Sequence, residues 1–289
     1  MVTAQVVFKL PRPLPEFNTT TDYFIQSDPK QPRQHPITNF GLKDQWTWDS
    51  LIEQIKLLPS HKLFLLQRHG EGYHNIAPAN YSKHEWNCYW QLRSGNGEVE
   101  WEDARLTPTG QAQITSLQKQ ITNTENFPRP HAFYVSPLRR TLETWELTWY
   151  DQGEVATIKE LARETYGIGT ESKRHSKTYI ETHYPGFAFE LGFTESDELW
   201  NPDFHESEQH RNYRAAKLLQ EIFNENQENN VISLVAHSGL IKSILQVIGH
   251  RKWPMYTGEL IPVVIAMTYD SKTYSLDDPW RSLKDVCKV

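Results

Sequence analysis

Cationic and imidazole side chains directly follow three apolar stretches of this chain: Arg68-His69, Arg139-Arg140 and His237. An arginine guanidinium suits phosphate, because its planar fork donates paired hydrogen bonds and stays charged at any relevant pH. A neutral imidazole can attack phosphorus through a ring nitrogen, and a second imidazole can donate to the phosphoryl oxygens. If the three groups meet, these residue types predict phosphoryl chemistry that needs no metal.

The three groups must be positioned by the stretches that precede them. Residues 63–66, 132–135 and 231–236 are continuous apolar runs, which suit strands buried on both faces of a parallel sheet. Carboxyl ends of parallel strands meet at one edge of the sheet, where open α/β folds bind ligands. Gly70 lets the backbone come close to a ligand there. The helices that follow the turns would add backbone donors.

We expect His69 to be the nucleophile, because the neighbouring cations lower the pKa of its imidazole and favour the neutral form. Arg68, Arg140 and His237 would hold the oxygens on which charge develops. Departure of an alkoxide requires a proton, and a carboxylic acid is the expected donor. The candidates for this acid are Glu71, Glu160, Glu164 and Glu171. No metal and no other cofactor is expected.

Four ordered motifs, which lie between about residue 46 and the C-terminus, resemble those of the histidine phosphatase superfamily, the phosphoglycerate-mutase-like enzymes. They are Arg68-His69-Gly70-Glu71, Leu106-Thr107-Pro108 with Gly110 and Gln113, Ser136-Pro137-Leu138-Arg139-Arg140 with Thr144, and Val235-Ala236-His237-Ser238-Gly239. The resemblance implies that His69 becomes phosphorylated. It also implies that Arg140 is the pocket arginine and that Asn75 reaches the phosphoryl group.

The same resemblance favours Glu164 as the acid, within Arg163-Glu164-Thr165-Tyr166-Gly167. The interval from Leu161 to Glu164 is one residue longer than the family spacing, so Glu160 stays the alternative. The fuller strings look most like the fungal phosphomutase-like branch, whose members are implied to act as phosphatases. These strings are Gly72-Tyr73-His74-Asn75, Trp90, Lys173-Arg174 and Asp197-Glu198-Leu199-Trp200.

The predicted fold is α/β, a three-layer α/β/α sandwich with a mostly parallel central sheet, in a single domain over 1–289. Apolar periodicity predicts helices at 46–58, 107–121, 139–149, 211–224 and 240–248. Short apolar runs predict further strands at 157–161 and 261–269. Residues 1–45 carry scattered prolines and are expected to be an extended N-terminal segment packing on the domain. Residues 168–210 show no clear periodicity, which is typical of a functional lid or substrate-facing insertion.

Composition excludes several other classes of function. The formal net charge of −6 gives no general attraction to nucleic acid or to anionic membranes. Only two cysteines, Cys88 and Cys287, are present, which argues against a disulfide framework or a structural zinc site. Neither a signal peptide nor a membrane-spanning run is apparent. We therefore expect a cytoplasmic protein, with the nucleus as a further location, that binds no nucleic acid or membrane.

The remaining charged residues have ordinary structural explanations. Arg139 is expected to be a helix-surface charge, and Lys173 and Arg174 are expected to be solvated lid charges. His74 and His84 are interpreted as pocket-rim or structural residues. His205 and His210 have the wrong spacing for a zinc-binding helix.

Sequence thus predicts a metal-independent phosphatase that hydrolyses a small organic phosphate monoester and releases inorganic phosphate. Two alternatives stay open. A phosphoglycerate-type phosphomutase would return the phosphoryl group to its substrate, although the modest Lys and Arg content of 168–210 favours hydrolysis. A non-catalytic phospholigand-binding protein would need to have lost turnover, yet all the catalytic residue types are present.

Overall fold

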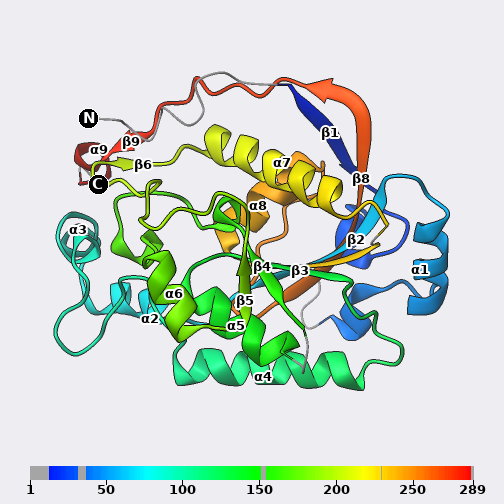
Figure 1. Ribbon diagram of the computed structural model, residues 1–289, viewed down its shortest axis with the longest axis horizontal. Coiled ribbons are helices and arrows are strands. Elements are labelled where there is room, and N and C mark those ends of the chain that lie inside the picture. The colour runs from blue at the N-terminus through cyan, green and yellow to red at the C-terminus, as the bar shows by residue number, and fades with distance from the viewer. Residues whose placement is uncertain (1–12, 32–36, 151–153, 229, 288–289) are drawn as a thin grey trace.

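A central sheet organises the computed structural model, which describes residues 13–31, 37–150, 154–228 and 230–287. Within this part of the chain the sheet has seven strands (Figure 1), in the order β1 (Leu14–Thr19), β8 (Leu260–Lys272), β2 (His61–Arg68), β7 (Val231–Ala236), β3 (Ala132–Val135), β4 (Ala156–Ile158) and β5 (Phe187–Phe189). The neighbouring strands β2, β7, β3, β4 and β5 are parallel to one another, and β8 is antiparallel to both β1 and β2. The mostly parallel sheet is as predicted.

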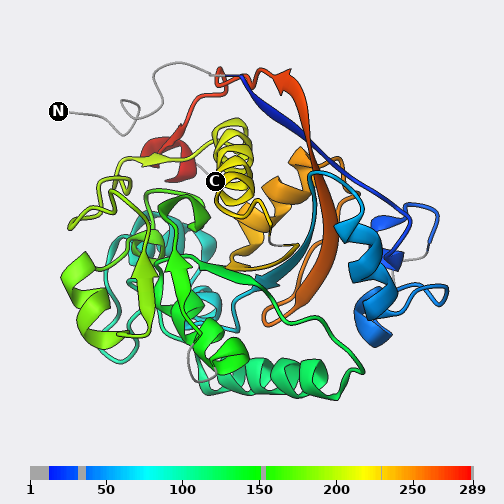
Figure 2. The same cartoon turned by 45° about the vertical axis from the view of Figure 1, so that its right-hand side comes forward.

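Helices cover both faces of the sheet (Figure 2). One face packs against α7 (Glu208–Glu225) and α8 (Ser238–Val247), and the other against α1 (Trp48–Lys56), α4 (Pro108–Asn123) and α5 (Arg139–Trp149). Strand β2 shows why its sequence is apolar throughout. Phe64 and Leu66 enter the core under α7 and α8, whereas Leu63 and Leu65 enter the core under α1 and α4. The predicted three-layer α/β/α architecture is confirmed.

Polar side chains define where several helices begin. Thr47, Thr107 and Ser207 each accept a hydrogen bond from a backbone N–H in the first turn of α1, α4 and α7, and Pro108 occupies the first position of α4. Each such cap stabilises a helix by about 1 kcal/mol. None of the helices in the described ranges combines the length and the apolar character needed to cross a bilayer.

Two regions for which the sequence predicted no regular structure contribute strands. Strand β1 lies in the N-terminal segment, where it pairs with β8 and buries Phe17; residues 1–12 and 32–36 of that segment lie outside the described ranges. Within 168–210, β5 extends the sheet, and α6 (Lys177–His183) packs its Ile180 against the core.

Short elements complete the periphery. Helices α2 (Tyr73–Ile76) and α3 (Lys83–Cys88) follow β2. Near the C-terminus, β9 (Arg281–Ser282) pairs with β6 (Phe204–His205) and leads into α9 (Leu283–Cys287). The segment that follows β8 therefore returns to the body of the molecule.

Candidate active site

Strand register brings the predicted catalytic groups to one level at the edge of the sheet. Arg68 of β2 lies opposite Ala236 of β7, so His69 and His237 are the next residues of two adjacent parallel strands. Val135 of β3 lies opposite Val235, so Ser136 follows at the level of Ala236, and its hydroxyl reaches the ring of His237. The ring centroids of His69 and His237 are 5.1 Å apart. The two histidines therefore meet, although 167 residues separate them in the sequence (237 − 69 − 1).

The imidazole of His69 is oriented by its own loop. Its Nδ1 lies 2.7 Å from the carbonyl oxygen of Gly70, and only a protonated Nδ1 can donate to a carbonyl. In the neutral ring this contact leaves the lone pair on Nε2. His69 is 2% exposed, and burial, followed by the charge of Arg140, holds its pKa well below the ordinary value. The ring is therefore neutral at pH 7, with its free lone pair on Nε2.

His237 is also held neutral beside it. This residue is fully buried, and its Nε2 lies 2.8 Å from the hydroxyl of Ser136. Burial and then Arg140 keep its pKa well below the ordinary value. Its buried Nδ1 has no hydrogen-bond partner among the described residues.

Two guanidinium groups face these rings. Arg68 donates from one terminal nitrogen to the carbonyl of Met255, at 2.7 Å, and Arg140 donates to the carbonyl of Glu171, at 2.8 Å. The buried Nε of each arginine finds no hydrogen-bond partner in the described part of the chain. Burial lowers the pKa of Arg140 to about 10, so its guanidinium stays charged at neutral pH. Unpartnered buried donors on two cations can bind an anion.

Of the candidate acids, the carboxylate of Glu164 lies at the start of α8, next to His237. Its Oε2 accepts from the backbone N–H of Gly239 at 3.1 Å, and its Oε1 accepts from that of Thr165 at 2.9 Å. Both Arg68 and Arg140 interact with it electrostatically. A Cβ added at Gly239 would lie 2.2 Å from Glu164 Oε1, so the glycine makes room for the carboxylate.

The other candidate acids are placed differently. Glu160 is bound by Arg174, whose Nε donates to it at 2.8 Å. Glu71 accepts a hydrogen bond from the Thr107 hydroxyl at 2.7 Å. Glu171 adjoins Arg140, and burial raises the pKa of its carboxyl group.

The loop 68–72, here called the histidine loop, is fixed by α4 and α5. The hydroxyl of Thr144 on α5 accepts from the N–H of Gly70 at 3.1 Å and donates to the carbonyl of Arg140 at 2.7 Å. A Cβ at Gly110 of α4 would lie 2.0 Å from the carbonyl oxygen of Glu71. The glycine is thus required for the helix to approach the loop.

Two residues of α2 adjoin the site. The side chain of Asn75 is exposed, and its Oδ1 accepts from the N–H of Gly72 at 2.9 Å. Any contact between Asn75 and a phosphoryl oxygen therefore belongs to its amide nitrogen. The ring of His74 lies 5.3 Å from that of His69, and burial and then Arg140 hold its pKa well below the ordinary value.

Sequence reasoning misjudged two of the arginines. Arg139, expected on the surface, is 5% exposed and donates to the carbonyls of Asp103 and Glu102 at 2.6 and 2.9 Å. Arg174, expected to be solvated, is 3% exposed and is paired with Glu160. Their partners lie far away in the sequence, so no local pattern indicated burial. Ser136 was likewise missed as a partner of His237, although the motif that contains it was recognised.

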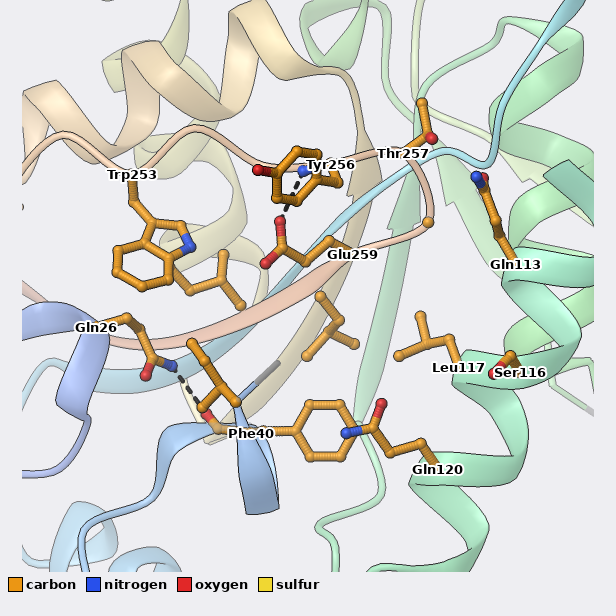
Figure 3. Close-up of a pocket in the computed structure, with 14 residues that line it drawn as sticks. Gln26, Phe40, Gln113, Ser116, Leu117, Gln120, Trp253, Tyr256, Thr257 and Glu259 are labelled. Carbon is orange, nitrogen blue, oxygen red and sulfur yellow. Dashed lines mark hydrogen bonds between the residues drawn. The ribbon is translucent and has the colours of Figure 1, made fainter. Parts of the chain in front are cut away.

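A groove of about 620 Å³ lies on the other side of the histidine loop, between α4 and the start of β8 (Figure 3). Leu117, Trp253 and Leu260 are among its lining residues. Its lining residue Gly258 donates from N–H to the carbonyl of His69 at 2.9 Å, and Gln113 accepts from the N–H of Glu71 at 2.9 Å. Residues that line the groove therefore hold the histidine loop by hydrogen bonds. None of the predicted catalytic side chains lines the groove.

Comparisons of sequence and structure relate this chain to known proteins. The model of the histidine phosphatase superfamily (branch 1) matches residues 64–258. "Phosphomutase-like protein 3" of Candida albicans is 52% identical over 277 residues, which cover 95% of this chain and 87% of that protein. "Probable phosphoglycerate mutase" of Arthroderma benhamiae is 36% identical, with coverage of 94% and 90%. Among solved structures, a mycobacterial glucosyl-3-phosphoglycerate phosphatase is 18% identical, with a TM-score of 0.43 and coverage of 74% and 100%.

Proposed function

Since this chain belongs to the histidine phosphatase superfamily (branch 1), we propose that it hydrolyses small organic phosphate monoesters through a phosphohistidine on His69. One observation carries the proposal. Two neutral imidazoles lie with ring centroids 5.1 Å apart. Beside them are the buried guanidinium of Arg140 and the partly buried guanidinium of Arg68, whose buried Nε donors have no partner in the described ranges. That arrangement suits a tetrahedral anion held for attack by a ring nitrogen.

In the first step the lone pair of His69 Nε2 attacks phosphorus, and the bond between phosphorus and the ester oxygen breaks. Arg68, Arg140 and His237 hold the remaining oxygens, where negative charge is greatest. Glu164 donates its proton to the leaving alkoxide, so an alcohol departs. The incoming phosphate dianion favours the protonated form of this carboxyl group before the step.

In the second step a water molecule attacks the phosphohistidine. The carboxylate of Glu164 now accepts the proton of that water, and the bond between Nε2 and phosphorus breaks. Inorganic phosphate leaves, and His69 and Glu164 return to their starting states. The carboxylate is supported in this role by the N–H groups of Gly239 and Thr165.

The first test replaces the nucleophile. His69→Ala should abolish phosphate release, because it removes the imidazole that forms the proposed intermediate, while circular dichroism should show an intact fold. His61→Ala is a matched control, since His61 lies at the opposite end of β2, and it should retain activity. Undiminished turnover in His69→Ala would exclude His69 as the nucleophile.

A phosphomutase is the second candidate, because the relatives named above are called mutases. The two reactions differ in what accepts the phosphoryl group. Incubation in ¹⁸O-labelled water should place the label in inorganic phosphate if the protein is a hydrolase. Isomer formation from phosphoglycerates, in excess over phosphate release, would favour the mutase instead.

A further inference from the structure

The two cysteines of this chain, which come from distant parts of the sequence, are brought together at the periphery. Cys88 is the last residue of α3, and Cys287 is the last residue of α9. The two helices contact each other on the side of the molecule that carries β6 and β9 (Figure 1). Both cysteines are free thiols of intermediate exposure, so a small reagent can reach them.

Specific contacts hold the two thiols next to each other. The Sγ of Cys287 lies 3.7 Å from the carbonyl oxygen of Asn87, the residue directly before Cys88. The Cys88 and Cys287 side chains also interact with each other, and this interaction contributes to a raised pKa of Cys88. On its other side, Cys88 Sγ lies 3.6 Å from Nδ1 of His84, one turn earlier in α3. A base and a second thiol therefore flank Cys88.

The C-terminal segment that carries Cys287 is anchored independently of the cysteines. Strand β9 pairs with β6, and the N–H of Leu283 donates to the carbonyl of Asp203 at 2.8 Å. The ring of Trp280 packs against that of His210, with centroids 4.9 Å apart. Helix α9 thus starts from a fixed point, and its position against α3 does not depend on the thiol contact alone.

Metal binding is a poor explanation for this cluster. Tetrahedral zinc sites use four ligands, or three ligands and a water molecule. The described residues contain no group of three or more His, Cys, Asp or Glu side chains arranged to hold a metal ion. Two adjacent thiols with a neighbouring imidazole suit thiol–disulfide exchange instead.

We propose that Cys88 and Cys287 form a reversible intramolecular disulfide, which fastens the C-terminal segment to α3. With a disulfide oxidant such as oxidised glutathione, the thiolate of Cys287 attacks one glutathione sulfur, and one glutathione thiolate leaves. Cys88 then loses its proton to His84 and attacks the sulfur of Cys287, releasing the second glutathione. Two protein thiols are oxidised, and one glutathione disulfide is reduced to two thiols.

The exchange should be slow at neutral pH. Partial desolvation and then the interaction with Cys287 raise the pKa of Cys88 to about 11, which disfavours its thiolate. Closure should consequently be faster at pH 8.5 than at pH 7. His84→Gln, which removes the base, should slow closure without preventing it.

Oxidation is tested on the full chain with oxidised glutathione as the probe, followed by blocking of free thiols. Intact mass should show the loss of two hydrogens, and peptide mapping should recover the segments of Cys88 and Cys287 cross-linked to each other. The link closes a loop over most of the chain and so lowers the conformational entropy of the unfolded state. The thermal midpoint of unfolding should therefore rise, and dithiothreitol should reverse the rise.

Single serine variants provide the matched controls. Cys88→Ser and Cys287→Ser should fold like the parent, carry one glutathione after oxidation and show no rise in the thermal midpoint. The proposal is overturned if the native parent gains two glutathiones without a cross-link, or if the cross-link forms only in urea. A cross-link that lowers the thermal midpoint would equally refute the stabilising role.

Discussion

Glu164 is the residue on which the proposed chemistry depends most after His69. Its carboxylate is held by two backbone N–H groups at the start of α8, and it adjoins both guanidiniums. From this position it can serve the leaving group and then the attacking water. Glu160, in contrast, is committed to Arg174.

Replacement of Glu164 by glutamine should lower kcat/KM, which reports the first step alone, by roughly 10²- to 10⁴-fold for an alkyl phosphate, because the leaving alkoxide loses its proton donor. The loss should be much smaller for p-nitrophenyl phosphate, whose phenolate leaves without a proton. Steady-state kinetics with both substrates would measure this difference.

Glu160→Gln is the comparison variant. It breaks the ion pair with buried Arg174, so it should reduce the denaturant midpoint of unfolding. Any change in kcat/KM should be the same for both substrates. If this variant, and not Glu164→Gln, showed the dependence on the leaving group, the assignment of the acid would have to be reversed.

Burial of single charges was the least predictable property at this scale. The residues next to Arg139 and Arg174 in the sequence do not distinguish them from solvated arginines. Their partners, Asp103 and Glu160, come close only in the folded chain. The residues that could be assigned from sequence are those that directly follow a buried strand.

At the scale of elements, the close contact between α4 and the histidine loop is the feature most sensitive to volume. Neither Gly110 nor Gly70 has space for a side chain. A Cβ at Gly70 would lie 2.6 Å from the carbonyl oxygen of Gly110, which is backbone and cannot rotate away. The two segments therefore determine each other's position.

Gly110→Ala should force the histidine loop away from α4 and displace His69 relative to His237. We expect kcat/KM to fall by about tenfold or more, because small misplacements of reacting groups are costly. The exposed neighbour Gln111 supplies a control, since Gln111→Ala should leave kcat/KM unchanged. Equal activity of the two variants would show that the loop tolerates the shift.

Elements buried on both faces were recognised from sequence, whereas elements at the margins were not. The apolar runs of β2, β3 and β7 have no other stable environment than the interior of a sheet. Strand β1, at the edge of the sheet, contains Pro15 and buries only Leu14 and Phe17, without the alternation of a regular strand, so its pattern resembles an extended loop. Strand β5 has only three residues, too few for a period to appear.

At the scale of the whole molecule, the buried neutral histidines make stability depend on pH. The pKa values of His69 and His237 are lowered in the folded state, so the unfolded chain binds protons that the folded chain does not. The stabilisation is complete above the unfolded value of about 6.5 and is lost as the pH falls below it. At pH 5.5 the free energy of unfolding should be lower by about 1.4 kcal/mol for each such histidine.

Urea unfolding of the parent and of His69→Asn at pH 7.5 and pH 5.5 tests this expectation. The variant should lose less stability on acidification than the parent, by about the contribution of one histidine. Other titrating groups act in both proteins and cancel in the comparison. Identical losses would mean that His69 takes up a proton equally well in the folded and unfolded states.

Strand β8 lies between β1 and β2, although it is synthesised after all the other strands of the sheet. A nascent chain that has not yet reached residue 258 lacks the partner for β1, for one side of β2 and for the carbonyl of His69. The ribosome must therefore synthesise the chain through β8 before the histidine loop can be held in place. Premature termination upstream of that point would leave two open strand edges, which invite association between unfinished chains.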